Sequence, residues 1–155
     1  MADPQTRVDE MVTKLRERGS RLTPQRMAVL KVLAVSEGHP SAEQVFERVR
    51  TDMPMISLAT VYKTVALLKD MGQVLELGFS DDGNRYDGNM PYPHPHLMCV
   101  RCREILDLDI GTLDELPQAV AQETGYRIVN HRLDFYGMCP RCQALEMDEA
   151  RQVSE

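Results

Sequence analysis

The four cysteines of this 155-residue chain form two pairs with identical spacing, and they constrain its fold more than any other feature. The pairs are Cys99-Val-Arg-Cys102 and Cys139-Pro-Arg-Cys142. Two residues between thiolates let both sulfurs of a tight turn face one metal ion, and four sulfurs at about 2.3 Å complete a tetrahedral zinc shell. Such a closed shell is structural because it leaves no coordination position for a substrate. We therefore predict a structural Zn²⁺ site.

Two other uses of the cysteines fit the sequence less well. Disulfides are typical of secreted proteins, whereas the polar residues 1–5 lack the apolar core of a signal peptide, so we expect a cytoplasmic protein. A thioredoxin-like redox pair would open a helix after a first strand, which neither pair does. The 36 residues between the pairs exceed the gap of a compact zinc ribbon. The metal would thus join the beginning and the end of a small domain and stabilise its fold.

The first 72 residues have the pattern of four short helices. Residues 8–15 place apolar side chains on one helix face, and Gly19 ends that helix. Thr23-Pro24 is typical of a cap followed by proline at the first helical position. Ser41 and Gln44 have the spacing of a capping box, which predicts a third helix after the turn at residues 38–40.

A fourth helix is predicted from a cap at Ser57 to about Met71, with Gly72 ending it. Its buried stripe is expected to contain Leu58, Val61, Tyr62, Val65 and Leu68. Its opposite face is expected to present Thr60, Lys63 and Thr64.

A hairpin is predicted directly after these helices. Residues 73–77 alternate as a strand, residues 80–84 form a turn cluster, and residues 85–87 return as the partner strand. Helices followed by one hairpin indicate a winged helix. We therefore predict a winged-helix domain at 1–88 and a Gly/Pro-rich linker or hinge at 89–93.

The remaining residues, 94–155, are predicted to form a small α+β domain, so the whole chain belongs to the α+β class. Strands are expected at 96–100, 104–110 and 127–136, the last with Ile128, Leu133 and Phe135 inside. A helix is expected from Leu113 to Thr124, ended by Gly125.

The net charge of −6 is unevenly distributed along the chain. Residues 1–80 contain 11 Lys/Arg and 10 Asp/Glu, whereas residues 81–155 contain 7 and 14. Because phosphate neutralisation is the main source of affinity for nucleic acid, only the first part is a plausible DNA surface.

No stretch approaches the roughly 20 apolar residues of a membrane helix, so no membrane partner is expected.

Three histidines and two aspartates are candidates for a second metal site. His94 and His96 lie two residues apart, so in an extended segment both imidazoles face the same side. His39, Asp87 and Asp107 would complete a set that suits iron(II) or manganese(II). A single histidine is more often a surface or core residue than a ligand, and periodicity alone does not bring these five together.

The sequence resembles the ferric uptake regulator family across residues 7–145. The matching segments are Arg21-Leu-Thr-Pro-Gln-Arg26, His39-Pro-Ser-Ala-Glu-Gln44, Ser57-Leu-Ala-Thr-Val-Tyr62, His94-Pro-His96-Leu-Met-Cys99-Val-Arg-Cys102, Asn130-His131-Arg132 and Tyr136-Gly-Met-Cys139-Pro-Arg-Cys142. No single segment is specific to this family, but the segments taken together are.

The resemblance implies a homodimeric repressor whose fourth helix enters the major groove of palindromic operator DNA. The matched recognition residues are Ser57, Ala59, Thr60, Tyr62 and Lys63. Arg21 is a candidate for a phosphate or minor-groove contact. Relatives often have arginine in place of Lys63, and lysine cannot offer guanine the same bidentate pairing.

The resemblance also implies that His39, Asp87, His94, His96 and Asp107 form a regulatory Fe²⁺ or Mn²⁺ site with ligands from both sides of the linker. A bound ion would then fix the two DNA-binding domains at one separation, and metal and DNA would strengthen each other's binding.

Aspartate at positions 87 and 107 resembles the peroxide-responsive members more than the iron-responsive ones, which more often have glutamate. In the peroxide-responsive members, peroxide oxidises a histidine ligand, and His39 and His94 occupy the matching positions. The shorter carboxylate is a small difference, and iron-responsive repression remains the alternative.

Some members have an additional metal site, which this sequence matches only in part. His131 and Asp114 match two of its positions, but Pro93 and Pro95 replace the others, and we interpret His131 as structural.

A metallo-hydrolase is disfavoured because no His-Glu-x-x-His motif occurs, so we predict no catalytic residues and no small-molecule substrate. A zinc-stabilised interaction module is the remaining alternative, and it would lack metal-dependent DNA affinity.

Overall fold

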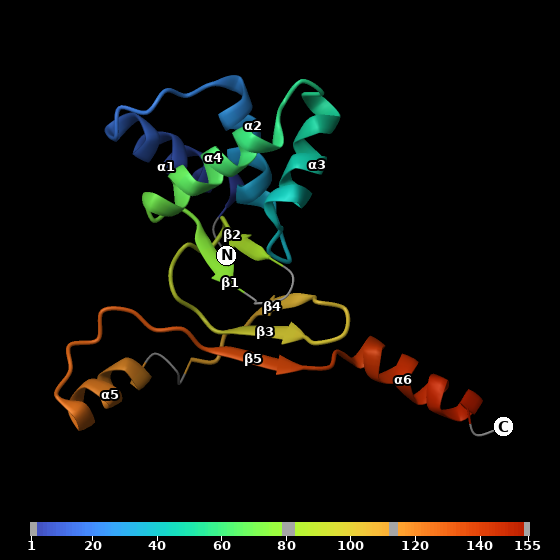
Figure 1. Ribbon diagram of the computed structural model, residues 1–155. Coiled ribbons are helices and arrows are strands. Elements are labelled where there is room, and N and C mark those ends of the chain that lie inside the picture. Colours follow the sequence, from blue (N-terminus) through green and yellow to red (C-terminus); the bar gives the residue numbers. More distant parts are fainter. Residues whose placement is uncertain (1–2, 79–82, 112–114, 154–155) are drawn as a thin grey trace. The chain divides into compact units, whose positions relative to one another are not determined.

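The computed structural model describes residues 3–78, 83–111 and 115–153. The chain divides into two compact units, the N-terminal unit Met1–Tyr92 and the C-terminal unit Pro93–Glu155. Within the described residues, no helix is both long enough and apolar enough to cross a membrane. The α+β class predicted from the sequence is confirmed, with the helices concentrated in the N-terminal unit (Figure 1).

The N-terminal unit contains four helices followed by a two-stranded hairpin (Figure 1). The helices are α1 (Pro4–Glu17), α2 (Pro24–Val35), α3 (Ala42–Asp52) and α4 (Leu58–Asp70), and the antiparallel strands are β1 (Leu75–Gly78) and β2 (Asn84–Asp87). The predicted caps are confirmed, because the side chains of Thr23 and Ser57 each accept a hydrogen bond from a backbone N–H in the first turn. Ser41 and Gln44 form the predicted capping box.

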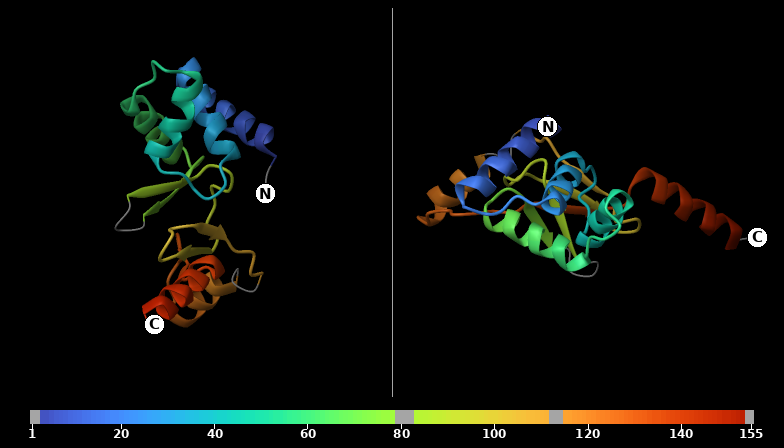
Figure 2. Two further views of the ribbon diagram at one scale, coloured as in Figure 1. Left: turned by 90° about the vertical axis from the view of Figure 1, so that its right-hand side faces the viewer. Right: turned by 90° about the horizontal axis from the view of Figure 1, so that it is seen from above.

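The helices pack around one apolar core, and Figure 2 shows them gathered together from two further directions. Its fully buried side chains include Met11, Leu15, Val29, Leu30, Leu33, Val45, Val61 and Leu68. Every helix contributes to this set. The periodic positions 8–15 of the first predicted helix are among the buried residues of α1, which confirms that prediction.

Two predictions for the faces of α4 are wrong. Thr64 is only 1% exposed, because it lies on the same side of the helix as Val61 and Leu68. Its hydroxyl donates to the Thr60 carbonyl (2.8 Å), which satisfies the polar group inside the core. Tyr62, in contrast, is 44% exposed rather than part of the buried stripe, which leaves it accessible on the outer face.

The C-terminal unit is built on a three-stranded sheet in the order β4-β3-β5. Its elements are β3 (His96–Cys99), β4 (Ile105–Asp107), α5 (Leu116–Thr124), β5 (Asp134–Gly137) and α6 (Pro140–Val153). Strand β3 pairs antiparallel with β4 and parallel with β5. Helices α5 and α6 lie beyond opposite ends of this sheet (Figures 1 and 2).

The sequence predicted this unit less accurately. The strand expected at 127–136 is reduced to Asp134–Gly137, and Phe135 is 41% exposed instead of buried. Helix α6 was not predicted, although Pro140 suits a first helical position. The helix expected from Leu113 begins at Leu116 in the described residues and ends at Gly125, whose φ of 73° gives the predicted left-handed cap. The start at Leu113 lies outside the described residues, as do residues 80–82 of the predicted turn.

The segment that follows β2 is fixed against the helices of the N-terminal unit. The Arg7 side chain donates from Nε to the Gly88 carbonyl (3.0 Å) and from Nη2 to the Gln73 carbonyl (2.9 Å). The Asn89 side chain donates to the Ala34 carbonyl (3.1 Å). Gly88 lies so close to α2 that a Cβ atom there would be 2.8 Å from the Leu33 carbonyl oxygen. This packing holds the chain directly next to Asp87.

We expect Gly88→Ala to lower the free energy of unfolding of the N-terminal unit by about 1–3 kcal/mol, because the added methyl group meets backbone rather than a movable side chain. Urea unfolding followed by circular dichroism measures the change. Gly78→Ala is the matched control, because its Cβ would have only an ordinary contact, 3.8 Å from Asn84 Oδ1. Equal stabilities of the two variants would contradict the proposed close packing.

Candidate metal centres and nucleic-acid interface

The four cysteine sulfurs come together in the C-terminal unit, with all four within 4.8 Å of one another. Cys99 ends β3 and Cys102 follows in the turn before β4, while Cys139 directly precedes α6 and Cys142 lies in its first turn. The Cys102 and Cys139 sulfurs are 3.8 Å apart. Sulfurs at the corners of a zinc tetrahedron with bonds of about 2.3 Å are separated by about the same distance.

Backbone amides donate hydrogen bonds to sulfurs of this cluster. The Cys139 N–H donates to Cys99 Sγ (3.3 Å) and the Cys142 N–H donates to Cys139 Sγ (3.4 Å). Hydrogen bonds from the backbone amides of Cys102 and Cys139 lower the pKa of the Cys99 thiol to about 6. The pKa of Cys102 is also lowered, mainly by the backbone N–H of Glu104. Thiolate is the form that binds zinc.

The fourth thiol has the opposite tendency, since burial raises the pKa of Cys142 to about 12. A cation beside this sulfur would favour its thiolate form. The tetrahedral spacing, the amide hydrogen bonds and the all-sulfur donor set together fit a structural zinc ion.

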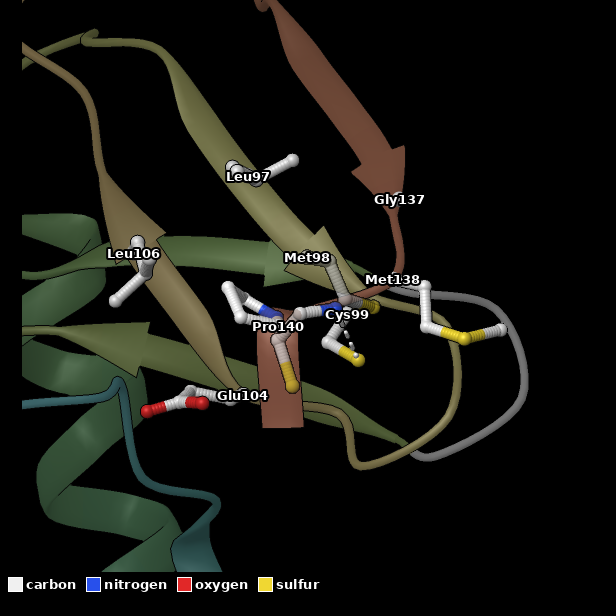
Figure 3. A pocket seen from close by; sticks show the side chains of 9 residues that line it. Leu97, Met98, Cys99, Glu104, Leu106, Gly137, Met138 and Pro140 are labelled. Atoms are coloured by element: carbon white, nitrogen blue, oxygen red, sulfur yellow. Dashed lines mark hydrogen bonds between the residues drawn. The ribbon is translucent and has the colours of Figure 1, made fainter. Parts of the chain in front are cut away.

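One side of the cysteine quartet faces an apolar pocket, shown in Figure 3. The pocket is lined by Leu97 and Met98 of β3, by Leu106 of β4 and by Met138 and Pro140 before and at the start of α6. Apolar surroundings limit the access of water to a metal centre and lower the local dielectric constant, which strengthens metal–thiolate bonds.

A histidine and a carboxylate meet within the N-terminal unit. His39 Nδ1 lies 3.6 Å from Asp87 Oδ2. Hydrogen bonds between the turn before α3 and strand β2 bring them together, because Tyr86 N–H donates to the Pro40 carbonyl (3.0 Å) and Arg85 Nη2 donates to the Gly38 carbonyl (2.7 Å). His39 has a φ of +53°, an uncommon conformation for a residue other than glycine, which directs its ring from this turn.

The Asp87 carboxylate is oriented by its own backbone. Its Oδ1 atom accepts hydrogen bonds from the N–H groups of Asn89 (2.9 Å) and Met90 (2.8 Å). Two amide donors hold Oδ1 in place and leave Oδ2 facing His39. The geometry therefore presents one imidazole and one carboxylate oxygen as a pair of potential metal ligands.

A second group of potential ligands occurs within the C-terminal unit. His96 and Asp107 are register partners in the antiparallel pair of β3 and β4, so their side chains are neighbours. Asp107 Oδ1 lies 3.1 Å from His94 Nε2 and 3.6 Å from His96 Nε2. The two imidazole ring centres are 4.2 Å apart. The extended segment at 94–96 thus places both rings beside one carboxylate.

The predicted DNA-contacting residues lie on or next to α4, with the exception of Arg21, which precedes α2. The exposed members are Arg21, Ser57, Ala59, Tyr62 and Lys63, whereas Thr60 is half-buried. Ser57 accepts a hydrogen bond from the Thr60 N–H as the cap of α4 (3.1 Å). A turn of exposed residues at a helix N-terminus is the geometry that places side chains against base edges.

Sequence reasoning did not identify Glu43, which contacts this surface from α3. The Tyr62 hydroxyl donates to a Glu43 carboxylate oxygen. This hydrogen bond lowers the pKa of Glu43 and raises the pKa of Tyr62. The hydrogen bond therefore orients the exposed Tyr62 ring. Only the packing of α3 against α4 could have indicated this contact of Glu43.

The additional metal site that the sequence matched in part gains no support. Asp114 lies outside the described residues. His131 is exposed, so its ring is not packed as our structural interpretation expected. Its backbone N–H donates to the Asn130 side chain (2.9 Å).

The fold and the sites together define the architecture of this chain. It is a winged helix followed by an α+β unit with a four-cysteine candidate metal centre. Residues 17–136 match the sequence model of the ferric uptake regulator family. The chain belongs to this family.

Known relatives resemble the chain over most of its length. It is 38% identical over 136 residues to the peroxide-responsive repressor PerR of Staphylococcus saprophyticus, covering 88% of this chain and 91% of the relative. A zinc-bound manganese uptake regulator has a similar structure, with a TM-score of 0.67, 33% identity and coverage of 85% of this chain and 98% of that one. The peroxide stress regulator of Campylobacter jejuni matches with a TM-score of 0.67 and 29% identity, over 86% of this chain and 97% of that one.

We expect Cys139→Ser to abolish zinc binding and the cooperative fold of the C-terminal unit, because structural zinc supplies on the order of 10–16 kcal/mol in small zinc domains. Metal analysis, circular dichroism and light scattering measure zinc content, fold and oligomeric state. Ala144→Ser, on the exposed side of α6, is the matched control. A folded, dimeric Cys139→Ser protein would show that the quartet is not the structural centre.

Proposed function

We propose that this protein is a metal-dependent transcriptional repressor that binds palindromic operator DNA as a homodimer and senses peroxide. The observation that carries the proposal is the formation of two partial ligand sets, one in each unit. The N-terminal unit pairs His39 with Asp87, and the C-terminal unit groups His94 and His96 with Asp107. The regulatory ion is Fe²⁺ or Mn²⁺ and takes ligands from both sets.

The chemistry of the two sets supports a shared ion. Two or three protein ligands leave a divalent transition metal incompletely coordinated, whereas five nitrogen and oxygen donors come close to filling an octahedral shell. Imidazole and carboxylate without thiolate suit iron(II) and manganese(II). The ligands of each set are already grouped within their own unit, so an ion has to order only the link between the units.

The link between the two units determines how metal binding regulates DNA binding in this proposal. We assign residues 1–88 to DNA binding, residues 94–155 to dimerisation and metal binding, and residues 89–93 to a hinge. An ion that binds both units restricts the hinge and favours one separation of the two DNA-binding domains of a dimer. Successive operator half-sites are about 34–36 Å apart, so this separation controls operator affinity. DNA must in turn strengthen metal binding, because coupling is reciprocal.

The exposed face of α4 supplies the DNA contacts in this proposal. Ser57, Ala59, Thr60, Tyr62 and Lys63 face the major groove, and Arg21 contacts the phosphate backbone or the minor groove. Lysine makes a point-charge contact where an arginine would make two parallel hydrogen bonds. The base preference at the position facing Lys63 is therefore weaker than with arginine.

Dimerisation through the C-terminal unit is supported by its exposed apolar side chains. They include Val100, Leu106, Ile110, Val120, Tyr126, Val129, Phe135, Tyr136, Leu145 and Met147, each at least 41% exposed. Strand β5 also lies at an edge of the sheet in the order β4-β3-β5. An edge strand with exposed aromatic residues is suited to pairing with a second copy of the chain.

Peroxide sensing is favoured over iron sensing by the aspartates at 87 and 107 and by the similarity to a peroxide-responsive repressor and a peroxide stress regulator. Iron(II) held by these residues would activate hydrogen peroxide by donating an electron that it regains when the histidine ring is oxidised. The net change at the ligand is the transfer of one oxygen atom from peroxide to a carbon of the His39 or His94 ring, with water as the other product. An oxidised ring binds metal poorly, so the hinge is released and repression ends.

The protein acts in this scheme without catalytic turnover, because the oxidised histidine is not regenerated by the reaction. It has no small-molecule substrate, and we place it in the cytoplasm, where bacterial operator DNA is found. The alternative within the family is an iron-responsive repressor with the same ligands, for which reversible metal loss replaces histidine oxidation.

We expect His94→Ala to keep the fold and to lose the metal-dependent part of operator affinity, about 5–150-fold for coupling of ordinary strength. A duplex selected from a random pool by the wild-type protein with Mn(II) serves as the probe, and mobility shifts with and without Mn(II) measure affinity. His131→Ala, which removes an exposed imidazole of the same unit, is the control. Normal activation of His94→Ala by Mn(II) would remove this residue from the regulatory site.

We expect dilute peroxide to add one oxygen atom to the peptides that carry His39 or His94 when the protein is loaded with Fe(II). Peptide mass spectrometry measures the addition, with the His131 peptide as internal control and Mn(II)-loaded protein as a second control. Unmodified histidines together with reversible, Fe(II)-dependent operator binding would support the iron-responsive alternative instead.

A further inference from the structure

An aspartate outside the proposed ligand set lies directly beside His96. Strand β5 runs parallel to β3, and Asp134 is the register partner of His96 in that pair. Asp134 Oδ1 is 3.6 Å from His96 Nδ1. This distance is within ion-pair range but is longer than a hydrogen bond. A side-chain movement of less than about 1 Å would bring the two atoms to hydrogen-bond distance.

The carboxylate of Asp134 is itself held in place. Its Oδ2 atom accepts a hydrogen bond from Arg132 Nε, and the side chain is only 12% exposed. Arginine thus compensates the charge of a carboxylate that would otherwise be costly to bury. The other oxygen, Oδ1, faces the imidazole.

The two nitrogens of His96 have different surroundings as a result. Nδ1 faces Asp134, whereas Nε2 faces Asp107 at 3.6 Å. His96 is also the more deeply placed of the two neighbouring histidines, with a side chain 1% exposed against 8% for His94. Its ring therefore lies between two carboxylates contributed by the strands on either side of β3.

We propose that Asp134 is a positioning residue that holds His96 in the tautomer required for metal binding. A neutral imidazole has a proton on one nitrogen and a lone pair on the other. Asp134 accepts the proton of Nδ1, which leaves the lone pair of Nε2 directed toward the ion beside Asp107. A carboxylate behind a ligating histidine fixes its ring orientation and increases its basicity. This inference rests on the proposed regulatory site and adds a residue outside its ligand set.

A structural role gives a different expectation from a positioning role. If Asp134 served only to pair with Arg132 at the edge of the sheet, its loss would affect stability but not the tautomer of His96. Asp134→Asn preserves the shape of the side chain, but its amide can turn and donate to Nδ1. Such a change behind a functional histidine is known to favour the wrong tautomer.

The first experiment measures the tautomer without any regulatory metal. The full-length, zinc-containing protein is labelled with ¹⁵N-histidine, and long-range ¹H–¹⁵N spectra are recorded at about pH 8.5, where an ordinary imidazole is neutral. His96→Gln identifies the His96 signals. We expect the Nδ1-protonated tautomer to predominate in the wild type and to lose its predominance in Asp134→Asn. Asp109→Asn removes an exposed carboxylate of the same unit and should leave the tautomer unchanged.

The second experiment measures Mn(II) affinity by calorimetric titration. We expect the dissociation constant to rise about 10–100-fold in Asp134→Asn, to stay near the wild-type value in Asp109→Asn, and to recover partly in Asp134→Glu. Unchanged tautomers, or weaker binding without a tautomer change, would overturn the positioning role. Absence of Mn(II) binding in the wild type would instead contradict the proposed regulatory site, while the tautomer measurement in metal-free protein would still decide the role of Asp134.

Discussion

The grouping of four cysteine sulfurs, which fits one structural zinc ion, is the feature on which the C-terminal unit depends. Among the described residues of this unit, the buried apolar side chains are only Met98, Cys99, Ile105 and Cys142. A core of this size contributes little stabilisation, and two of its four members are themselves ligands. The quartet connects the end of β3 with the start of α6, immediately after β5. A zinc ion bound by these four sulfurs would hold β3 and β5 in the parallel register that the structure shows.

The register of this sheet determines what the histidines can do. It places His96 opposite Asp107 on one side and Asp134 on the other. The structural zinc and the proposed regulatory ion thus have separate roles but share β3. The N-terminal unit prepares its own ligand pair independently, because hydrogen bonds between β2 and the turn before α3 orient His39 and Asp87. In the proposed function both ligand groups bind one ion, and each group is already formed within its own unit.

Local signals in the sequence predicted much of the fold and the four-cysteine site, whereas pairings between distant segments were harder to predict. Caps such as Thr23 and Ser57 and the Cys-x-x-Cys spacing depend on residues within one turn, so they are visible in the sequence. The contact of Asp134 with His96 depends on the parallel register of β5 and β3, which no short motif encodes. The burial of Thr64 followed the position of α4 against the core rather than the polarity of its side chain.

The central claim is that one ion binds ligands from both units and thereby couples metal to DNA binding. A crystal of the Mn(II)-loaded dimer, with anomalous diffraction measured at the manganese absorption edge, tests it most directly. We predict one strong peak per chain beyond the zinc, within bonding distance of His39 and Asp87 and also of His94, His96 and Asp107. A manganese peak whose protein ligands all come from one unit would contradict it.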